Sequence, residues 1–262
     1  MLLEAENLSV GYRTPVVQQV SFGLEPGRVV GLLGRNGCGK STLLRGLCGS
    51  ARVFGGRVAV SGRDALAMSA RQRARHIALL PQRVGLLPGL TAGEVILMGR
   101  YAHGGLFAGP TAGDRALARD TARAFGVEQL LDRDCAALSE GQRQLVHLCR
   151  VAVQQAPVLL LDEPNSALDF GNTHLLFAAL RRWAAEENRA VLTVLHDPAL
   201  ALTCCDRLLL MEQGRLCGSL DPGAGAQAAQ QALEAIYPGI RVTEVENRLF
   251  CTLDLHQFSD KD

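Results

Sequence analysis

Three short apolar runs constrain the fold of this 262-residue chain more than any other feature. RVVGLL at 28–33, VLLLD at 158–162 and AVLTVLHD at 190–197 are apolar almost throughout. Strands with one face in water alternate apolar and polar residues, so these runs predict strands that are buried on both faces. Amphipathic segments such as residues 172–188 lie between them. The alternation predicts an α/β fold with helices around a mostly parallel sheet.

The rest of the chain divides into blocks of different composition. Residues 1–33 contain short β-like runs separated by turns, which predict an N-terminal antiparallel β subdomain leading into the first buried strand. Residues 90–155 lose β character and become rich in Ala, Arg and Leu at helical spacing, as expected for an inserted helical subdomain. We therefore expect one domain over 1–220, followed by a helix and hairpin extension over 221–262.

Composition excludes several classes of protein. The 27 basic and 26 acidic residues give a net charge of +1, without the basic excess expected of a nucleic-acid-binding protein. The eight cysteines show no Cys-x-x-Cys spacing, so we expect reduced thiols and neither a zinc site nor disulfides. The start MLLEAENLSV is acidic where a signal peptide is basic, and no apolar run approaches the ~20 residues of a membrane span. We expect a soluble chain that can still dock on a membrane protein.

A glycine-rich stretch, GRNGCGKST, follows the first buried run and precedes a helix-like segment. Gly34, Gly39, Lys40 and Ser41 complete the phosphate-binding loop pattern, which disfavours the alternative of a simple turn. Without Cβ atoms to obstruct them, the backbone N–H groups can surround a phosphate, and the helix N-terminus adds partial positive charge. Lys40 would reach the β- and γ-phosphates, and Ser41 would hold Mg²⁺. The predicted phosphate-binding residues are Gly34, Arg35, Asn36, Gly37, Cys38, Gly39, Lys40, Ser41 and Thr42.

Two other buried runs also end at polar side chains. Asp162 lies where the second run leaves the sheet, across from Ser41, and its carboxylate can hold the magnesium ion. Glu163 follows directly and could orient or deprotonate a water molecule that attacks the γ-phosphate. Asp-Glu-Pro is also favourable chemistry for starting a helix, but the complete glycine loop favours the site. His196 ends the third run, where it could bond to the γ-phosphate; a structural surface histidine is the alternative.

The segment LSEGQRQ at 138–144 resembles the signature motif of ATP-binding-cassette (ABC) proteins. The glycine loop, Gln82 after ALLP, VLLLDEP, SALD at 166–169 and His196 stand in the order and approximate spacing of that family, over residues 1 to about 220. The resemblance implies a P-loop NTPase with a RecA-like sheet that binds ATP and Mg²⁺. It also implies that Gln82 contacts the metal and takes part in catalysis. Tyr12 matches the aromatic residue that stacks on adenine, although a turn tyrosine remains the alternative.

The signature segment has two interpretations that use the same geometry. Ser139 is a good N-cap and Gln142 completes a capping box, so a capped helix start is the structural interpretation. The resemblance implies that this helix start receives the γ-phosphate of ATP bound to another copy, in a head-to-tail dimer with two shared sites. Glu140 stands where glycine is common, and we expect its side chain to point away from the nucleotide. The predicted nucleotide-binding residues from this part of the chain are Ser139, Gly141, Gln142 and Asp169.

The biological role divides between a transporter subunit and a soluble ATPase of DNA repair or translation. Repair enzymes of this superfamily place long coiled coils before the signature, and translation factors carry two cassettes; this chain has neither feature. LTAGEVILMGRYAH at 90–103 and the tail at 233–253 resemble importers of iron–siderophores, haem and cobalamin, and molybdate or tungstate importers remain the alternative. The resemblance implies a separate transmembrane permease, indirectly a periplasmic binding protein, and a place at the cytoplasmic face of the bacterial inner membrane. We expect the permease contact within about residues 83–115.

Overall fold

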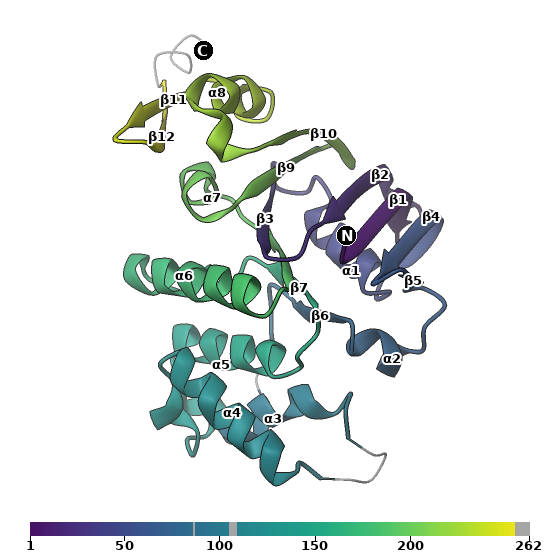
Figure 1. Ribbon diagram of the computed structural model, residues 1–262, viewed down its shortest axis with the longest axis vertical. Coiled ribbons are helices and arrows are strands. Elements are labelled where there is room, and N and C mark those ends of the chain that lie inside the picture. Colours follow the sequence, from purple (N-terminus) through teal and green to yellow (C-terminus); the bar gives the residue numbers. More distant parts are fainter. Residues whose placement is uncertain (86, 105–108, 255–262) are drawn as a thin grey trace.

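The computed structural model describes residues 1–85, 87–104 and 109–254. Its centre is a six-stranded sheet in which five neighbouring strands run parallel and the edge strand β10 runs antiparallel (Figure 1). In spatial order the strands are β10 (Arg215–Leu220), β9 (Arg207–Glu212), β3 (Arg28–Leu33), β8 (Ala190–Val194), β7 (Val158–Asp162) and β6 (Ile77–Leu80). The predicted α/β fold with a mostly parallel sheet is confirmed.

Side chains of the central strands alternate between two apolar cores. Val29 and Leu33 of β3 pack in the core shared with α6 (Phe170–Glu186) and α7 (Pro198–Cys204). Val30 and Leu32 pack in the opposite core, with α1 (Lys40–Leu47) and the N-terminal sheet. Because both faces of the sheet are covered, its strands appear in the sequence as continuous apolar runs.

The N-terminal sheet is antiparallel, as predicted, but it is not built from the N-terminus alone. Its strands in spatial order are β2 (Pro15–Leu24), β1 (Leu3–Gly11), β4 (Arg52–Val60) and β5 (Arg63–Asp64). β1 and β2 precede α1 in the sequence, whereas β4 and β5 follow it. The sheet is therefore built from segments on both sides of α1 in the sequence. A five-residue helix, α2 (Ala70–Ala74), then leads to β6.

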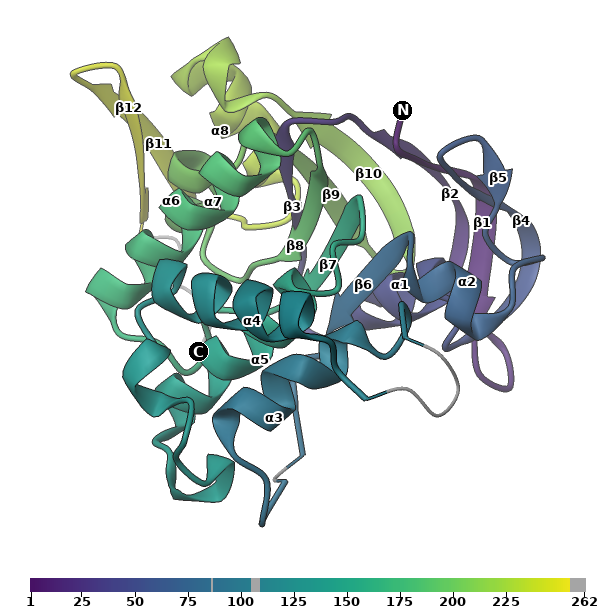
Figure 2. The same cartoon turned by 60° about the horizontal axis from the view of Figure 1, so that its bottom comes forward.

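The helical block has an apolar core of its own, formed by the helices α3 (Ala92–Leu97), α4 (Ala112–Ala124) and α5 (Glu140–Ala152) (Figure 2). Short 3₁₀ turns connect them at η1 (Met98–Arg100), η2 (Glu128–Leu130) and η3 (Cys135–Ala137). Each of the three helices begins with a capping box, which fixes its first residue. Leu148 and Val151 of α5 point instead into the core against the central sheet. Helix α5 therefore joins the block to the sheet.

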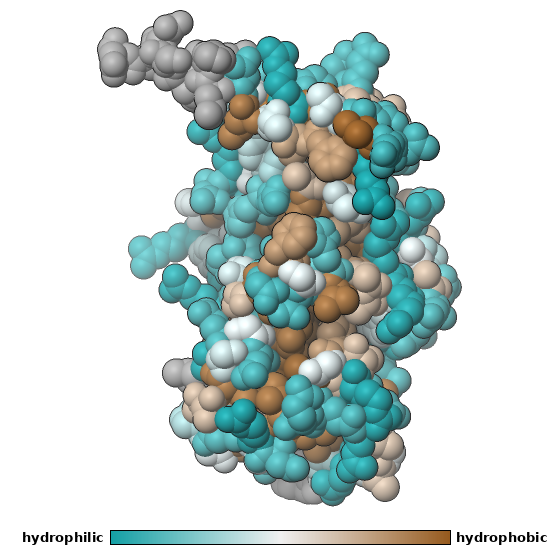
Figure 3. All heavy atoms as spheres, turned by 90° about the vertical axis from the view of Figure 1, so that its left-hand side faces the viewer, coloured by the Kyte–Doolittle hydropathy of each residue, from teal (hydrophilic) through white to brown (hydrophobic). Residues whose placement is uncertain are grey.

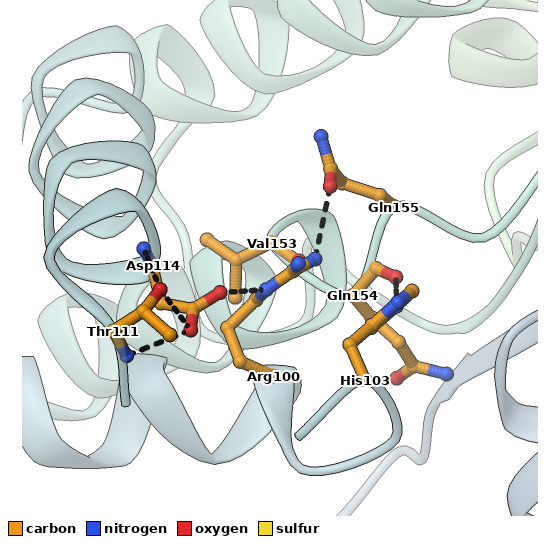
Figure 4. A network of polar contacts seen from close by, with 7 residues as sticks. All are labelled: Arg100, His103, Thr111, Asp114, Val153, Gln154 and Gln155. Atoms are coloured by element: carbon orange, nitrogen blue, oxygen red, sulfur yellow. Dashed lines mark hydrogen bonds and ion pairs between the residues drawn. The ribbon is translucent and has the colours of Figure 1, made fainter. Parts of the chain in front are cut away.

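Polar contacts around Arg100 hold the segment after α3 in place (Figure 4). Its guanidinium lies 2.6 Å from Asp114 Oδ1 and donates to Val153 O at 2.8 Å and to Gln155 Oε1 at 2.9 Å. His103 Nε2 lies 2.8 Å from the carbonyl of Gln154. The start of α4 and the end of α5 are thus bonded to the same short segment.

The C-terminal extension packs back onto the sheet. It consists of η4 (Pro222–Ala224), α8 (Ala226–Glu234) and a hairpin of β11 (Ile240–Val245) and β12 (Arg248–Leu253), at the top of Figure 1. Glu246 and Asn247 at the hairpin turn both have positive φ, 50° and 59°, as a two-residue type I′ turn requires. Leu233, Ile236 and Ile240 are buried in the core shared with α7, which fixes the extension to the domain.

Across the described ranges, no helix combines the length and the apolar character needed to cross a membrane. Apolar side chains nevertheless reach the surface, in a band among hydrophilic residues on the face seen in Figure 3. The most exposed large apolar side chains of the described residues are Phe170 and Leu175 of α6, at 82% and 69%. Clustered exposed apolar residues are typical of surfaces that contact a partner.

Candidate nucleotide-binding and hydrolysis site

The loop between β3 and α1 has the backbone that a phosphate cradle needs. Gly37 and Gly39 have φ of 78° and 108°, a left-handed conformation in which L side chains are strained. A Cβ on Gly39 would also lie 3.1 Å from Val17 and 3.2 Å from Met211, so the position has little room for one. Arg35 and Asn36 are exposed, whereas Cys38 and Thr42 are buried below the loop. The loop thus offers backbone N–H groups and a helix N-terminus to an anion.

Lys40 is the first residue of α1 and is only 6% exposed. Its Nζ donates to the carbonyls of Gly34 at 2.7 Å and Arg35 at 3.1 Å, so the side chain folds over the loop. These carbonyls hold the ammonium group at the phosphate cradle. Oxygens of the β- and γ-phosphates entering the loop would meet a cation already in position, which is the role expected of Lys40.

Ser41 and Asp162 meet at the ends of neighbouring elements, as the sequence predicts. Ser41 Oγ donates to Asp162 Oδ1 at 3.1 Å, although the two residues are 121 positions apart. Asp162 is 2% exposed, and burial raises its pKa, with the charge of Glu163 acting in the same direction. A buried carboxylate beside a hydroxyl is an oxygen-donor set that suits Mg²⁺, which would relieve the cost of its burial.

Glu163 and His196 also come together at this edge of the sheet. His196 Nε2 lies 2.5 Å from Glu163 Oε1, and the side chains are 43% and 14% exposed. Glu163 has a φ of 53°, which is uncommon for a residue with a side chain and marks a constrained position. Such backbone strain concentrates at functional sites. The structure therefore places the predicted base and the predicted histidine in direct contact.

Gln82 lies two residues after β6, whose Leu80 pairs in register with Leu161 of β7. This pairing brings Gln82 beside the strand end that carries Asp162. The backbone N–H of Gln82 opposes the rise in the pKa of the Asp162 carboxyl. The Gln82 side chain is exposed, so it can reach outward from the sheet edge.

Tyr12 lies in the turn between β1 and β2 and is 50% exposed. Its hydroxyl accepts a hydrogen bond from Arg45 Nη1 at 2.9 Å. Arg45 is on α1, the helix that starts with Lys40, so the bond connects the predicted adenine-stacking ring to the phosphate-loop helix. Arg45 was not among the residues predicted from the sequence. Its position five residues after Lys40, on a helix adjoining the loop, is the only local signal that could have identified it.

The signature residues form the capped start of α5. Ser139 Oγ accepts from the backbone N–H of Gln142 at 3.2 Å, and Gln142 Oε1 accepts from the N–H of Ser139 at 3.2 Å. The predicted capping box is confirmed. Gly141 lies close to Ala167 O, which a Cβ there would approach to 2.9 Å. In both cartoon views α5 belongs to the helical block (Figures 1 and 2).

Asp169, which was predicted to bind nucleotide, is the N-cap residue of α6. Its Oδ1 accepts from the backbone N–H of Asn172 at 2.8 Å, and its Oδ2 from the Asn172 side chain at 2.9 Å. Within one chain this aspartate therefore stabilises a helix start. The exposed Phe170 follows it directly, so the segment faces outward.

A phosphate-binding loop, a buried aspartate and a Glu–His pair at the carboxyl edge of a parallel sheet define a P-loop ATPase with a separate capped signature helix. The family model described as ABC transporter matches residues 17–166, and the chain belongs to that family. It is thus an ATP-hydrolysing cassette of the ABC type.

Individual relatives narrow the comparison. The chain is 42% identical over 227 residues to the hemin import ATP-binding protein HmuV of Pseudomonas putida, covering 85% of this chain and 86% of the relative. It is 39% identical over 220 residues to the cobalamin import ATP-binding protein BtuD of Halobacterium salinarum, covering 82% of this chain and 54% of that longer protein. A solved metal-chelate type ABC transporter in an inward-facing conformation has a TM-score of 0.78 at 27% identity, covering 95% of each chain. A dimeric bacterial ABC cassette shares the fold, with a TM-score of 0.76 at 23% identity.

Proposed function

We propose that this chain is the ATP-hydrolysing subunit of a bacterial importer for a metal chelate of the haem, iron–siderophore or cobalamin type. One observation carries the proposal. The chain assembles the phosphate loop, Asp162, Glu163 and His196 at one sheet edge, and its capped signature helix α5 starts in the helical block. Its similarity to a hemin import protein over most of both chains supports the transported class.

Within the site, each group has a distinct part. Lys40 and the loop N–H groups bind the β- and γ-phosphates of ATP. Ser41, Asp162 and Gln82 hold Mg²⁺, which would neutralise charge on the phosphates when bound. Glu163 orients or deprotonates the attacking water, and His196, at hydrogen-bond distance from it, positions that carboxylate and can itself bond to the γ-phosphate. Tyr12 stacks on the adenine while Arg45 holds its hydroxyl.

The second half of each site comes from another copy of the chain. Ser139, Gly141 and Gln142 form the capped start of α5, a helix of the helical block. A head-to-tail dimer brings each signature helix to the γ-phosphate of ATP on the partner, where the helix N-terminus favours negative charge. Asp169 and the exposed Phe170 extend this contact at the start of α6.

The permease contacts the helical block, at the cytoplasmic face of the membrane, within about residues 83–115. In this region Tyr101 is 65% exposed. The backbone beside it is fixed, because the carbonyl of Ala102 accepts from Arg71 Nε at 3.2 Å and from Arg75 Nε at 2.8 Å. An exposed aromatic ring on a fixed segment is well suited to a protein interface. A periplasmic binding protein delivers the chelate to the other side of the permease.

Reconstitution tests the transported class. The chain is co-purified with a many-span permease and placed in vesicles with ATP and Mg²⁺ inside. We expect ATP-dependent accumulation of haem, ferric siderophore or cobalamin, and none with the Glu163→Gln variant. Accumulation of molybdate or tungstate would contradict the proposed substrate class. Failure to associate with any permease would indicate a soluble ATPase instead.

A further inference from the structure

A pocket of about 460 Å³ lies where the helical block meets the end of β6. It is distinct from the phosphate loop and is bordered on one side by the segment that follows β6. On the other side it is bordered by one face of α5, at helical spacing. The charged, amide and imidazole side chains lining it are Gln82, Arg83, Glu140, Arg143, Gln144 and His147.

His147 is the most unusual of these residues. It is 1% exposed, and neither ring nitrogen has a hydrogen-bond partner among the described residues. Buried polar groups are almost always bonded, because leaving one unsatisfied is costly. Burial, with the charges of Arg150 and Arg143, lowers the pKa of His147 to about 4. Its neutral ring therefore has an unsatisfied N–H donor in the wall of the pocket.

The charges around the pocket favour an anion. Arg83 and Arg143 both line it, and neither forms an ion pair with a described residue. Glu140 supplies the one opposing carboxylate of the lining, which leaves one net positive charge. The amide groups of Gln82 and Gln144 add further donors, one N–H of Gln144 being bonded to Pro164 O at 3.2 Å. Guanidinium groups form strong hydrogen bonds to oxyanions, and neighbouring neutral N–H groups can donate to the same anion.

The position of the pocket indicates which oxyanion reaches it. Gln82 lines the pocket and also lies beside Asp162, through the pairing of β6 with β7. Ser166 and Ala167 line it too, three and four residues after Glu163. Phosphate released by hydrolysis at Glu163 therefore appears next to one wall of the pocket.

We propose that this pocket binds inorganic phosphate, held by Arg143, His147 and Arg83, as it leaves the hydrolysis site. The identity of the source rests on the proposed function, because the phosphate comes from the site around Glu163. The binding of phosphate itself does not, because it depends only on the donors of the pocket. The volume accommodates the ion with part of its hydration shell. We therefore expect weak, transient binding of phosphate.

Calorimetric titration of the full chain with inorganic phosphate tests the site directly. A Lys40→Ala background removes the cation of the phosphate loop, so that the remaining binding reports on the pocket. In that background we expect Arg143→Gln and His147→Leu each to weaken phosphate binding about tenfold. Glu140→Gln should strengthen it, because it removes the opposing charge. Arg119→Gln, an equal loss of charge on the exposed surface of α4, should leave it unchanged.

Two results would overturn the proposal: no phosphate binding in the Lys40→Ala background, or binding that Arg143→Gln and His147→Leu both leave intact. Inhibition of ATP hydrolysis by added phosphate distinguishes phosphate released by hydrolysis from phosphate that enters from solution. Weaker inhibition in Arg143→Gln than in Arg119→Gln identifies the ion as the product of hydrolysis. Equal inhibition, with phosphate binding still lost in the titration, restricts the pocket to phosphate from solution and removes the exit role. Absence of hydrolysis in the unmodified chain would contradict the proposed function while leaving the titration valid.

Discussion

At the scale of single residues, Glu163 combines a strained backbone with a close contact between its carboxylate and a histidine. Its backbone has a positive φ, and its carboxylate lies within 2.5 Å of the His196 imidazole. Backbone strain of this kind costs of order 1–3 kcal/mol and persists where the surrounding structure enforces it. Here the enforcing element is β7, which ends at the fully packed Asp162 and leaves Glu163 to turn out of the sheet.

We expect Glu163→Gln to keep ATP binding but lower turnover by at least about 100-fold, as loss of a general base does. The amide removes a negative charge beside the γ-phosphate, so the ATP-bound dimer should persist. Size analysis with ATP and Mg²⁺ should show a stable dimer for this variant. The control is Glu186→Gln, an exposed glutamate at the end of α6. A Glu163→Gln protein that hydrolyses ATP at the rate of the control would remove Glu163 from catalysis.

At the scale of elements, local pattern predicted which side chains meet at the sheet edge better than it predicted how the strands pair. The side chains Asp162, Glu163 and His196 were identifiable because each follows a buried strand, and the ends of parallel strands share one edge. The bond from Arg45 to Tyr12 was not identifiable, because it depends on how a β-turn packs beside α1. For the same reason the pattern did not show that β4 pairs with β1. Such contacts join segments distant in sequence, so the local pattern of either segment does not specify its partner.

The start of α5 gives a test of the unusual Glu140. This residue is exposed in the first turn, where a carboxylate stabilises the helix dipole by roughly 0.3–1 kcal/mol. Glu140→Gly removes that interaction and adds backbone freedom, so we expect a slightly lower melting temperature. The dependence of hydrolysis on ATP concentration should change little, because Ser139 and the Gly141 N–H remain. A clear gain in apparent ATP affinity would show that the carboxylate faces the γ-phosphate.

The contacts at the start of α4 predict a pH dependence (Figure 4). Hydrogen bonds from Thr111, and then from Arg100, lower the pKa of Asp114 from 3.8 to about 2. A carboxyl whose pKa is lower in the folded chain stabilises it above about pH 4, and the contribution disappears as the pH falls towards 2. Asp114→Ala should therefore reduce the free energy of unfolding by about 1–2 kcal/mol at pH 7.

The same variant should differ progressively less from the unmodified chain as denaturant unfolding is repeated between pH 5 and pH 2.5. Asp120→Ala, on the same helix, is the control, because that carboxylate is 69% exposed in its ion pair with Arg123. Exposed ion pairs contribute little to stability. An Asp114→Ala effect that stays constant down to pH 2.5 would mean that the side chain acts through packing rather than charge.

At the scale of the whole molecule, the helical block and the C-terminal extension lie at opposite ends of the sheet (Figure 1). Only one of these ends can be the main contact of a permease, and we expect the helical block. A photo-crosslinking amino acid in place of Tyr101 should label the permease, whereas the same group in place of Phe250 of β12 should not. The two side chains are comparably accessible, at 65% and 49% exposure. Labelling from position 250 alone would place the contact on the extension.

The proposed head-to-tail dimer leads to a prediction about mixtures of two inactive variants. Lys40→Ala disables the phosphate loop of a chain, and Ser139→Arg, at an exposed N-cap, obstructs its signature helix. If each site takes its loop from one copy and its signature from the other, a mixed dimer has one site with both defects and one intact site. Random pairing makes about half of the dimers mixed, each with one of two sites complete, so up to about a quarter of the unmodified activity should return.

The measurement is ATP hydrolysis by the two variants alone and after mixing at equal concentration. A double variant carrying both changes in one chain, mixed with the Lys40→Ala protein, is the control, because none of its dimers has a complete site. If instead each chain bound and hydrolysed ATP with its own signature helix, every variant chain would stay defective in any mixture. Activity no greater than the sum of the separate variants would therefore favour sites within single chains. Recovery above that sum requires the loop and the signature to meet across two copies.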